Sequence, residues 1–166
     1  MVQQKEIFFI RHAKSDWSEP GMRDFERPLN GRGNKDASSI GEFLKSKIKV
    51  PYYIHCSSSQ RTRETCQHFV KIWNTDSDAI NFEDSLYHGS LADFKSSIRS
   101  TNDKFHHIVL IAHNPTMDEL VRRLTKYAIY DMPTCGVIQT TYRLNSWRDF
   151  DFQYLNFVDR YVPKEI

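Results

Sequence analysis

Four side chains that can bind or attack a phosphate group stand close to the ends of short apolar segments. They are Arg11, His12, Arg61 and His113. Arginine forks bind phosphate oxygens through paired hydrogen bonds, and an imidazolium adds a further donor. A neutral imidazole can also attack phosphorus and form a covalent phosphoryl intermediate, which divides a difficult displacement into two steps. These residue types predict a site for a tetrahedral dianion, with His12 or His113 as the nucleophile.

The sequence lacks the motifs of other phosphate chemistries. It contains no Gly-rich phosphate loop, no run of carboxylates that would hold magnesium, and no Cys-containing phosphate loop. His106 and His107 adjoin no carboxylate cluster, so we do not expect them to bind a metal. The sequence therefore predicts chemistry without a metal or another cofactor.

The apolar segments that precede these side chains are typical of strands in a parallel sheet. Residues 7–10, 52–56 and 108–112 are short apolar runs of the kind that is covered on both faces. In open α/β sheets the ligand crevice lies beyond the carboxyl ends of the strands. We therefore expect the four side chains to converge on one rim of an α/β fold.

Helical patterns alternate with these strands. Apolar residues recur at helical spacing in the segments 37–48, 62–73 and 91–98, and serines before the second segment are expected to cap it. A fourth helix is expected to be capped by Asn114, with Pro115 at its first position.

The last part of the chain has strand patterns. Residues 137–144 and 150–158 are separated by residues 145–147, which can form a turn. These two strands are expected to complete the sheet, antiparallel at one edge. The sequence contains no internal repeat and no linker, so we predict a single domain over residues 1–166.

Composition limits the partners and the location. A net charge of +2 does not demand a nucleic acid partner, and no apolar stretch approaches the roughly 18 residues that span a membrane. The segment before Arg11 is too short and polar for a signal peptide. Three cysteines, Cys56, Cys66 and Cys135, fit no disulfide framework. We therefore expect a cytoplasmic protein with neither a nucleic acid nor a membrane as partner.

Five motifs, taken together, resemble one family. In chain order they read FFIRHAKSDW, RDFERPLNGRG, CSSSQRTRET, LYHGS and AHNP. They resemble signatures of the histidine phosphatase superfamily, which includes phosphoglycerate mutases, and most closely its SixA-type phosphohistidine phosphatase branch. The resemblance covers nearly the whole chain. It implies a phosphoglycerate mutase-like three-layer α/β/α sandwich with a mostly parallel sheet of about five or six strands and an antiparallel edge.

The same resemblance implies roles for the site residues. It makes His12 the phosphoryl acceptor and places Arg11, Arg61 and His113 in the phosphate pocket. Ser18 and Asn114 are further candidates for phosphate binding, although turn formation or capping explains each of them equally well. We expect His12 to be neutral for its attack and His113 to act as a charged donor.

The acid that protonates the leaving group is left open. Many superfamily members use a glutamate after the third strand, and His88 stands at about that position, with Glu83 and Asp84 nearby. An imidazole leaving group needs less protonation than an alkoxide, which favours phosphohistidine as the substrate. Most of the segment 13–35, with Asp24, is interpreted as a solvated loop held by salt bridges.

The leading expectation is a metal-independent phosphatase that acts on phosphohistidine of a phosphorelay or histidine phosphotransfer protein. One alternative is a phosphomonoesterase for a small phosphorylated molecule, and another is a catalytically silent phosphate-binding adaptor. A chain of 166 residues has little room for a lid, which favours a protein-borne phosphate. His12 argues against an adaptor, because binding alone needs no nucleophile.

Overall fold

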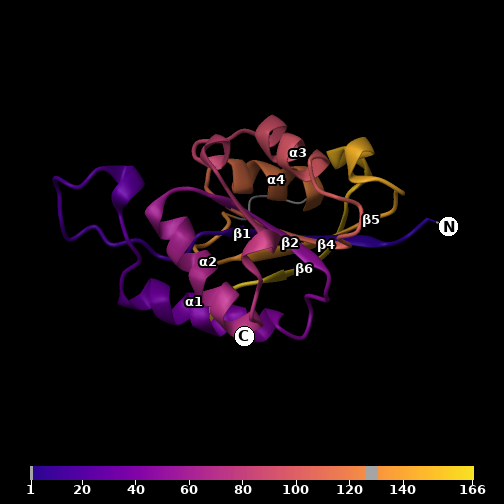
Figure 1. Ribbon diagram of the computed structural model, residues 1–166. Coiled ribbons are helices and arrows are strands. Elements are labelled where there is room, and N and C mark those ends of the chain that lie inside the picture. Colours follow the sequence, from indigo (N-terminus) through magenta and orange to yellow (C-terminus); the bar gives the residue numbers. More distant parts are fainter. Residues whose placement is uncertain (1, 126–130) are drawn as a thin grey trace.

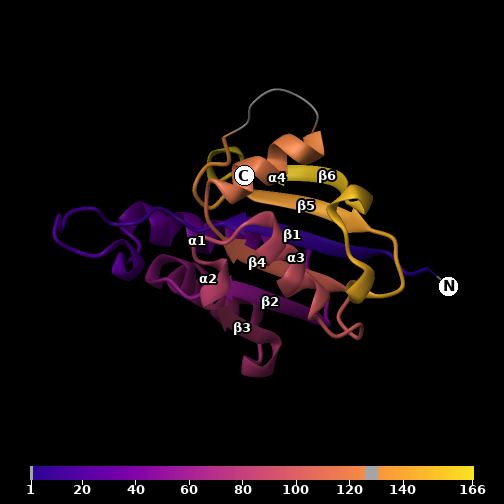
Figure 2. The same cartoon turned by 90° about the horizontal axis from the view of Figure 1, so that it is seen from above.

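A computed structural model describes residues 2–125 and 131–166 of the chain. Within these residues, one sheet is flanked by helices on both faces (Figures 1 and 2). Its strands are β1 (Lys5–Arg11), β2 (Tyr52–Ser57), β3 (Ile80–Glu83), β4 (His107–Ala112), β5 (Val137–Tyr142) and β6 (Asn156–Tyr161). The helices are α1 (Gly31–Leu44), α2 (Gln60–Trp73), α3 (Leu91–Arg99) and α4 (Thr116–Thr125). None of the helices in the described ranges is long and apolar enough to cross a bilayer.

The sheet has the strand order β3-β2-β4-β1-β5-β6. The first four strands in this order are mutually parallel, whereas β5 runs antiparallel to β1 and β6 antiparallel to β5. The prediction of a mostly parallel α/β sheet with an antiparallel edge is therefore confirmed. Because β1, β2 and β4 are parallel neighbours, their carboxyl ends lie at the same edge of the sheet.

Both faces of the sheet are covered because successive side chains of a strand point to opposite sides. Ile7 and Phe9 belong to the apolar cluster that includes residues of α3 and α4. Phe8 and Ile10 belong to the other cluster, with residues of α1 and α2. Figure 1 shows the two helix pairs on opposite sides of the sheet, which confirms the three-layer architecture.

The C-terminal strands and the third strand differ from the sequence prediction. Residues 150–155 are not a strand, because two short 3-10 turns, Trp147–Asp149 and Phe152–Tyr154, precede β6. The aromatic side chains of Trp147, Phe150 and Phe152 are buried in one cluster instead of alternating between two faces. The pattern also missed β3, because this edge strand has no buried side chain.

Two helix starts also differ from the prediction. The hydroxyl of Ser59, the residue before α2, lies 2.7 Å from that of Thr62 and makes no cap bond to the backbone. Helix α4 begins at Thr116, after a cis peptide bond between Asn114 and Pro115. The Asn114 amide donates to Asp118 Oδ2 at 2.9 Å instead of capping the helix. The capping roles of Ser59 and Asn114 were thus wrong.

Candidate active site

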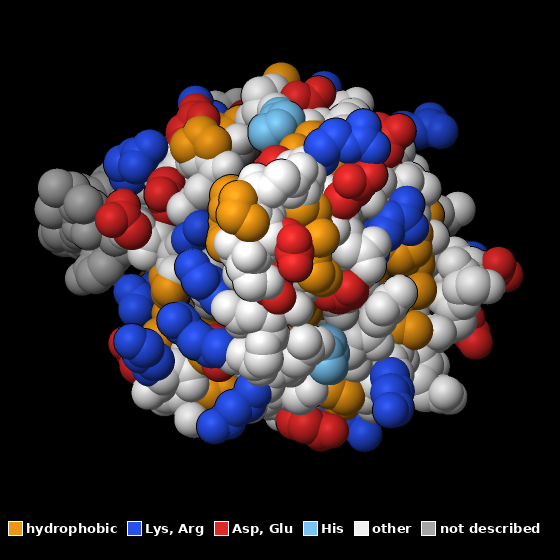
Figure 3. Space-filling view, turned by 90° about the vertical axis from the view of Figure 1, so that its left-hand side faces the viewer, with side chains coloured by type: hydrophobic (Ala, Val, Ile, Leu, Met, Phe, Trp, Pro, Cys, Tyr) orange, Lys and Arg blue, Asp and Glu red, His pale blue; other side chains and the backbone are white. Residues whose placement is uncertain are grey.

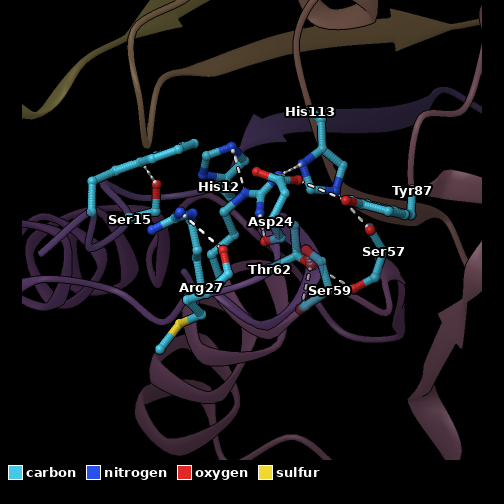
Figure 4. Close-up of polar contacts among 12 residues, drawn as sticks. His12, Ser15, Asp24, Arg27, Ser57, Ser59, Thr62, Tyr87 and His113 are labelled. Atoms are coloured by element: carbon cyan, nitrogen blue, oxygen red, sulfur yellow. Dashed lines mark hydrogen bonds and ion pairs between the residues drawn. The ribbon is translucent and has the colours of Figure 1, made fainter. Parts of the chain in front are cut away.

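The edge formed by the ends of β1 and β4 brings together residues that are far apart in the chain (Figure 4). His12 follows β1 and His113 follows β4, and their ring centroids are 5.1 Å apart. Arg61, in the first turn of α2, contacts both rings. Its Nε lies 3.3 Å from His12 Nε2, and its Nη2 lies 3.4 Å from His113 Nδ1. One guanidinium therefore joins the two histidines.

His12 has the protonation and orientation of a nucleophile. The ring is buried, and its Nδ1 lies 2.7 Å from the carbonyl oxygen of Ala13. Because a carbonyl only accepts, Nδ1 carries the proton, which leaves a lone pair on Nε2 beside Arg61. Burial lowers the pKa of His12 to about 3, with a further contribution from the charges of Arg61 and Arg11. Nε2 is thus a neutral, nucleophilic nitrogen.

The backbone around His12 is held from two sides. The Ala13 N–H donates to the Thr65 hydroxyl of α2 at 3.0 Å. On the other side, the Cys135 N–H donates to the carbonyl oxygens of Arg11, at 3.0 Å, and His12, at 2.9 Å. Cys135 adopts a positive φ of 60° in making this shared contact. These contacts fix His12 between α2 and the segment that leads into β5.

His113 is neutral in this structure. Its Nε2 lies 2.7 Å from Ser57 Oγ, and its Nδ1 faces the Arg61 guanidinium, which can only donate. Nε2 therefore carries the proton and donates to Ser57. Burial, with further contributions from the nearby His12 and Arg61, lowers the pKa of His113 to about 2. Burial and a neighbouring cation both disfavour a charge on His113 here, whereas the expectation of a charged His113 concerns the site with a phosphate dianion bound and stays a prediction.

Arg11 is oriented by the segment before β5. Its Nη1 donates to the carbonyl oxygen of Met132 at 2.7 Å. The Met132 N–H in turn donates to Asp118 Oδ1 at 2.6 Å, and Asp118 also accepts from Asn114. Arg11 Nε is buried and has no hydrogen-bond partner within residues 2–125 and 131–166. Asn114 thus contacts Asp118 rather than any of the four central side chains.

Asp24 enters the site, although its sequence context indicated a solvated loop. Its Oδ2 lies 3.0 Å from Arg61 Nη2 and accepts the Tyr87 hydroxyl at 2.6 Å, and its backbone oxygen accepts Arg61 Nη1 at 2.7 Å. Burial raises the pKa of Asp24, but the hydrogen bonds from Tyr87 and Arg61 outweigh it, so the pKa lies below its usual value. Sequence reasoning missed this carboxylate, Tyr87 and the Ser57 contact, because no local pattern encodes them.

None of the three residues considered as leaving-group acids has a hydrogen bond to His12 in the described part of the chain, although the charge of His88 acts on His113. His88 is exposed, and its ring centroid lies 4.0 Å from that of the adjacent Tyr87. Glu83 contacts His55 Nδ1 at 2.7 Å, and Asp84 accepts the Ser58 hydroxyl. Neither carboxylate has a hydrogen bond to the four central side chains in the described part of the chain.

The sequence candidate Ser18, and Arg63, the other arginine at the start of α2, have different partners. Ser18 is exposed, and its backbone N–H donates to Asp16 at 2.8 Å. Arg63 Nε donates to the Ser58 carbonyl at 2.7 Å, and its guanidinium lies over Phe82. Arg61 and not Arg63 is therefore the α2 arginine that meets His12.

The chemistry of the site follows from the side chains that face it. They comprise two guanidiniums, two neutral imidazoles and one carboxylate. In the described ranges, no three His, Cys, Asp or Glu side chains are grouped so that they could hold a metal ion. Figure 3 looks onto this end of the molecule, where basic and acidic side chains are interspersed. The positive charge is therefore local to the site, as an arrangement that binds and attacks a tetrahedral oxyanion requires.

Comparison with known proteins gives this site a context. Residues 7–86 match the model of the histidine phosphatase superfamily (branch 1). An uncharacterized chloroplastic protein of Arabidopsis thaliana is 28% identical over 153 residues, which cover 87% of this chain and 70% of that protein.

Two solved structures share the fold. One, from Agrobacterium tumefaciens and provisionally described as the phosphohistidine phosphatase SixA, has a TM-score of 0.79 and 24% identity, over 96% of this chain and 98% of the other. The other, the protein histidine phosphatase SixA complexed with tungstate, has a TM-score of 0.78 and 19% identity, over 96% and 97%.

Proposed function

We propose that the chain is a member of the histidine phosphatase superfamily, whose model matches residues 7–86, and that it is a metal-independent phosphatase that dephosphorylates phosphohistidine on a phosphotransfer protein. Membership of this family supports the coarser assignment as a phosphatase. The observation that carries the mechanism is the hydrogen bond from His12 Nδ1 to the Ala13 carbonyl, which directs the lone pair of Nε2 toward Arg61.

In the first half of the reaction, the His12 lone pair attacks phosphorus and the bond to the leaving group breaks. Arg11 and Arg61 hold the phosphoryl oxygens and stabilise the charge that spreads over them in the transition state. The bound dianion favours protonation of His113, which then becomes a further donor. In the second half, water attacks the phosphoryl group on His12 and releases phosphate.

The substrate class is supported by the leaving group and by structural likeness. The residues considered as acids are His88, at about the position where relatives often have glutamate, and the nearby Glu83 and Asp84, and none of them has a hydrogen bond to His12 in the described part of the chain. An imidazole leaving group tolerates this arrangement better than an alkoxide does. One solved structure that shares the fold is described as a phosphohistidine phosphatase and another as a protein histidine phosphatase, and the second description favours a protein-borne substrate.

The proposal is tested by turnover in the presence of EDTA. A histidine phosphotransfer protein carrying labelled phosphohistidine, a small phosphoramidate and p-nitrophenyl phosphate would each be incubated with the protein. We expect release of phosphate from all three and the highest kcat/KM with the phosphorylated protein. Loss of activity on chelation, with recovery on adding magnesium or zinc, would contradict the metal-independent mechanism.

The two alternative functions predict different results in the same experiment. A small-molecule phosphomonoesterase would turn over p-nitrophenyl phosphate but leave the phosphorylated protein intact. An adaptor would bind the phosphorylated protein saturably and release no phosphate.

A further inference from the structure

The proposed reaction moves two protons whose carriers the sequence does not identify. The leaving group must gain a proton in the first half, and the attacking water must lose one in the second. Glu83 and Asp84 are bonded to His55 and Ser58, away from the nucleophile. In the described part of the chain, Asp24 is the carboxylate that pairs with the guanidinium of Arg61, which also meets His12.

The position of Asp24 relative to the nucleophile is set by Arg61. One edge of the guanidinium lies 3.3 Å from His12 Nε2, and another of its nitrogens lies 3.0 Å from Asp24 Oδ2. Figure 4 shows the Asp24 carboxylate beside the rings of His12 and His113. Asp24 comes from the loop before α1, whereas both histidines follow strands of the sheet. A phosphoryl group held by Arg61 would thus have the nucleophile and the carboxylate as neighbours.

We propose that Asp24 is the catalytic acid and base of this site. The inference rests on the proposed function and extends it, because it assigns both proton transfers to one residue outside the β3 region. Tyr87, whose hydroxyl donates to Asp24 Oδ2 at 2.6 Å, is a positioning residue that holds the carboxylate.

The two proton transfers return Asp24 to its initial protonation state. In the first half, His12 Nε2 bonds to phosphorus, the bond from phosphorus to the leaving atom breaks, and that atom takes the proton of the neutral Asp24 carboxyl. In the second half, the ionised carboxylate takes a proton from water as its oxygen bonds to phosphorus. The bond from phosphorus to Nε2 then breaks, and its electron pair returns to His12. Asp24 is neutral again, and one water has been consumed.

Substrate binding causes Asp24 to take up from solvent the proton that it donates in the first half of the reaction. The charged and titratable groups that face Asp24 are Arg61 on α2, Tyr87 after β3, and His12 and His113 at the strand ends. Arg61 is the cation among them that pairs with the carboxylate. A phosphate dianion that engages Arg61 removes this partner and adds a like charge nearby. Both changes favour protonation of Asp24.

A series of leaving groups separates this role from simple charge pairing. Asp24→Asn keeps the shape and an acceptor for Tyr87 but cannot carry the proton. With a phosphate ester of a poor leaving group, such as phenyl phosphate, we expect kcat to fall by about 100-fold or more. With 2,4-dinitrophenyl phosphate, the initial burst of dinitrophenol should persist and the phosphoenzyme should accumulate, because only the attack of water then lacks its base. Asp16→Asn, in the same loop, is the matched control and should behave as wild type.

A second variant is tested by its pH profile, which would not shift if Asp24 had only a structural role. Tyr87→Phe removes a hydrogen bond to the ionised carboxylate, so the limb of the pH profile that reports Asp24 should shift to higher pH. This variant keeps the carboxyl and should retain most of the turnover at its own optimum. An unshifted limb would contradict the assignment of that limb to Asp24.

The results that overturn the inference differ from those that overturn the proposed function. If Asp24→Asn matches or exceeds wild-type turnover with every leaving group and binds tungstate more tightly, Asp24 only competes with phosphate for Arg61. Absence of turnover by the wild-type protein with every substrate would instead overturn the proposed function.

Discussion

At the scale of single residues, the backbone contact of His12 decides which of its nitrogens can react. The Ala13 carbonyl fixes the proton on Nδ1, and Arg61 lies at Nε2. His113 is held in the opposite sense, with its proton on Nε2 toward Ser57. The two imidazoles therefore differ in tautomer although they are neighbours, and each turns its unprotonated nitrogen toward Arg61.

The first prediction concerns the covalent intermediate. His12→Ala should abolish the acid-labile phosphoenzyme and lower turnover by several orders of magnitude, because the displacement loses its nucleophile. Rapid acid quench with labelled substrate measures the intermediate. His68→Ala, on the side of α2 that contacts Asn34 and Ser38, is the control and should retain the phosphoenzyme. A His12→Ala variant with a tenth of the wild-type activity would rule out this nucleophile.

The second prediction concerns the charge of the two histidines. Their pKa values of about 3 for His12 and about 2 for His113 lie below the usual value, so both rings should stay neutral from pH 8 to pH 5. Nitrogen-15 spectra of histidine-labelled protein should show Nδ1–H for His12 and Nε2–H for His113 over this range. A titration of either ring with a midpoint near 6.5, the usual value for histidine, would contradict the prediction.

At the scale of elements, the start of α1 positions the loop that follows β1. Asn30 caps the helix by accepting the Gly33 N–H at 2.8 Å, and the Asn30 N–H donates to the Lys14 carbonyl at 3.0 Å. A Cβ at Gly33 would lie 2.1 Å from that same carbonyl oxygen. The helix can approach Lys14, two residues after the nucleophile, only because Gly33 has no side chain.

The third prediction follows from this close approach. Gly33→Ala should lower the free energy of unfolding by about 1–3 kcal/mol, the usual cost of forcing atoms into a packed site. It should also reduce kcat, because the displaced backbone adjoins His12. Urea unfolding and steady-state kinetics measure the two effects.

The same helix supplies a matched control. A Cβ at Gly31 would meet no atom within 4 Å, and alanine is favoured over glycine in helices by up to about 1 kcal/mol. Gly31→Ala should therefore be neutral or stabilising and fully active. Equal losses of unfolding free energy and of kcat in the two variants would show that the contact of Gly33 with Lys14 is not the cause.

At the scale of the whole molecule, packing buries groups whose charge depends on pH. Lys5 is buried and pairs with Asp103 at 2.8 Å, which ties the start of β1 to the segment before β4. Burial raises the pKa of Asp103, but hydrogen bonds from Lys5, Trp147 and Ser146 outweigh it and lower this pKa to about 2. The stabilisation from this pair is fully present above about pH 4 and is lost as the pH falls toward 2.

The fourth prediction is that, as the pH is lowered, the free energy of unfolding begins to fall at a pH well above that at which carboxylates titrate. The unfolded chain protonates His12 and His113 near pH 6.5, whereas the folded chain does so near pH 3 and pH 2. The unfolded state thus binds more protons below pH 6.5, and each histidine costs up to about 1.4 kcal/mol of stability per pH unit. Urea unfolding at pH 8, 6.5, 5 and 4 should show this slope, and His113→Gln should reduce it. A constant free energy of unfolding between pH 6.5 and 5 would contradict it.

The sequence alone determined the layered fold and the set of residues that meet at one edge. Apolar runs at 7–10, 52–56 and 108–112 became β1, β2 and β4, because strands buried on both faces are apolar throughout. Parallel neighbours end at the same edge, so the residues after these runs could be expected to converge. The edge strand β3 and residues 150–155 escaped prediction, because partial exposure in one and irregular aromatic packing in the other leave no periodic signal.

Only the tertiary structure decided which groups meet and which are charged. Asp24 and Tyr87 come to Arg61 from separate loops, and a contact between distant loops has no signature in either segment. The neutral state of His113 also depends on packing, because desolvation is set by all the atoms that surround a group and not by its neighbours in the chain. Composition and periodicity describe each segment by itself, whereas tautomer, charge and proton transfer depend on what the folded chain places around each side chain.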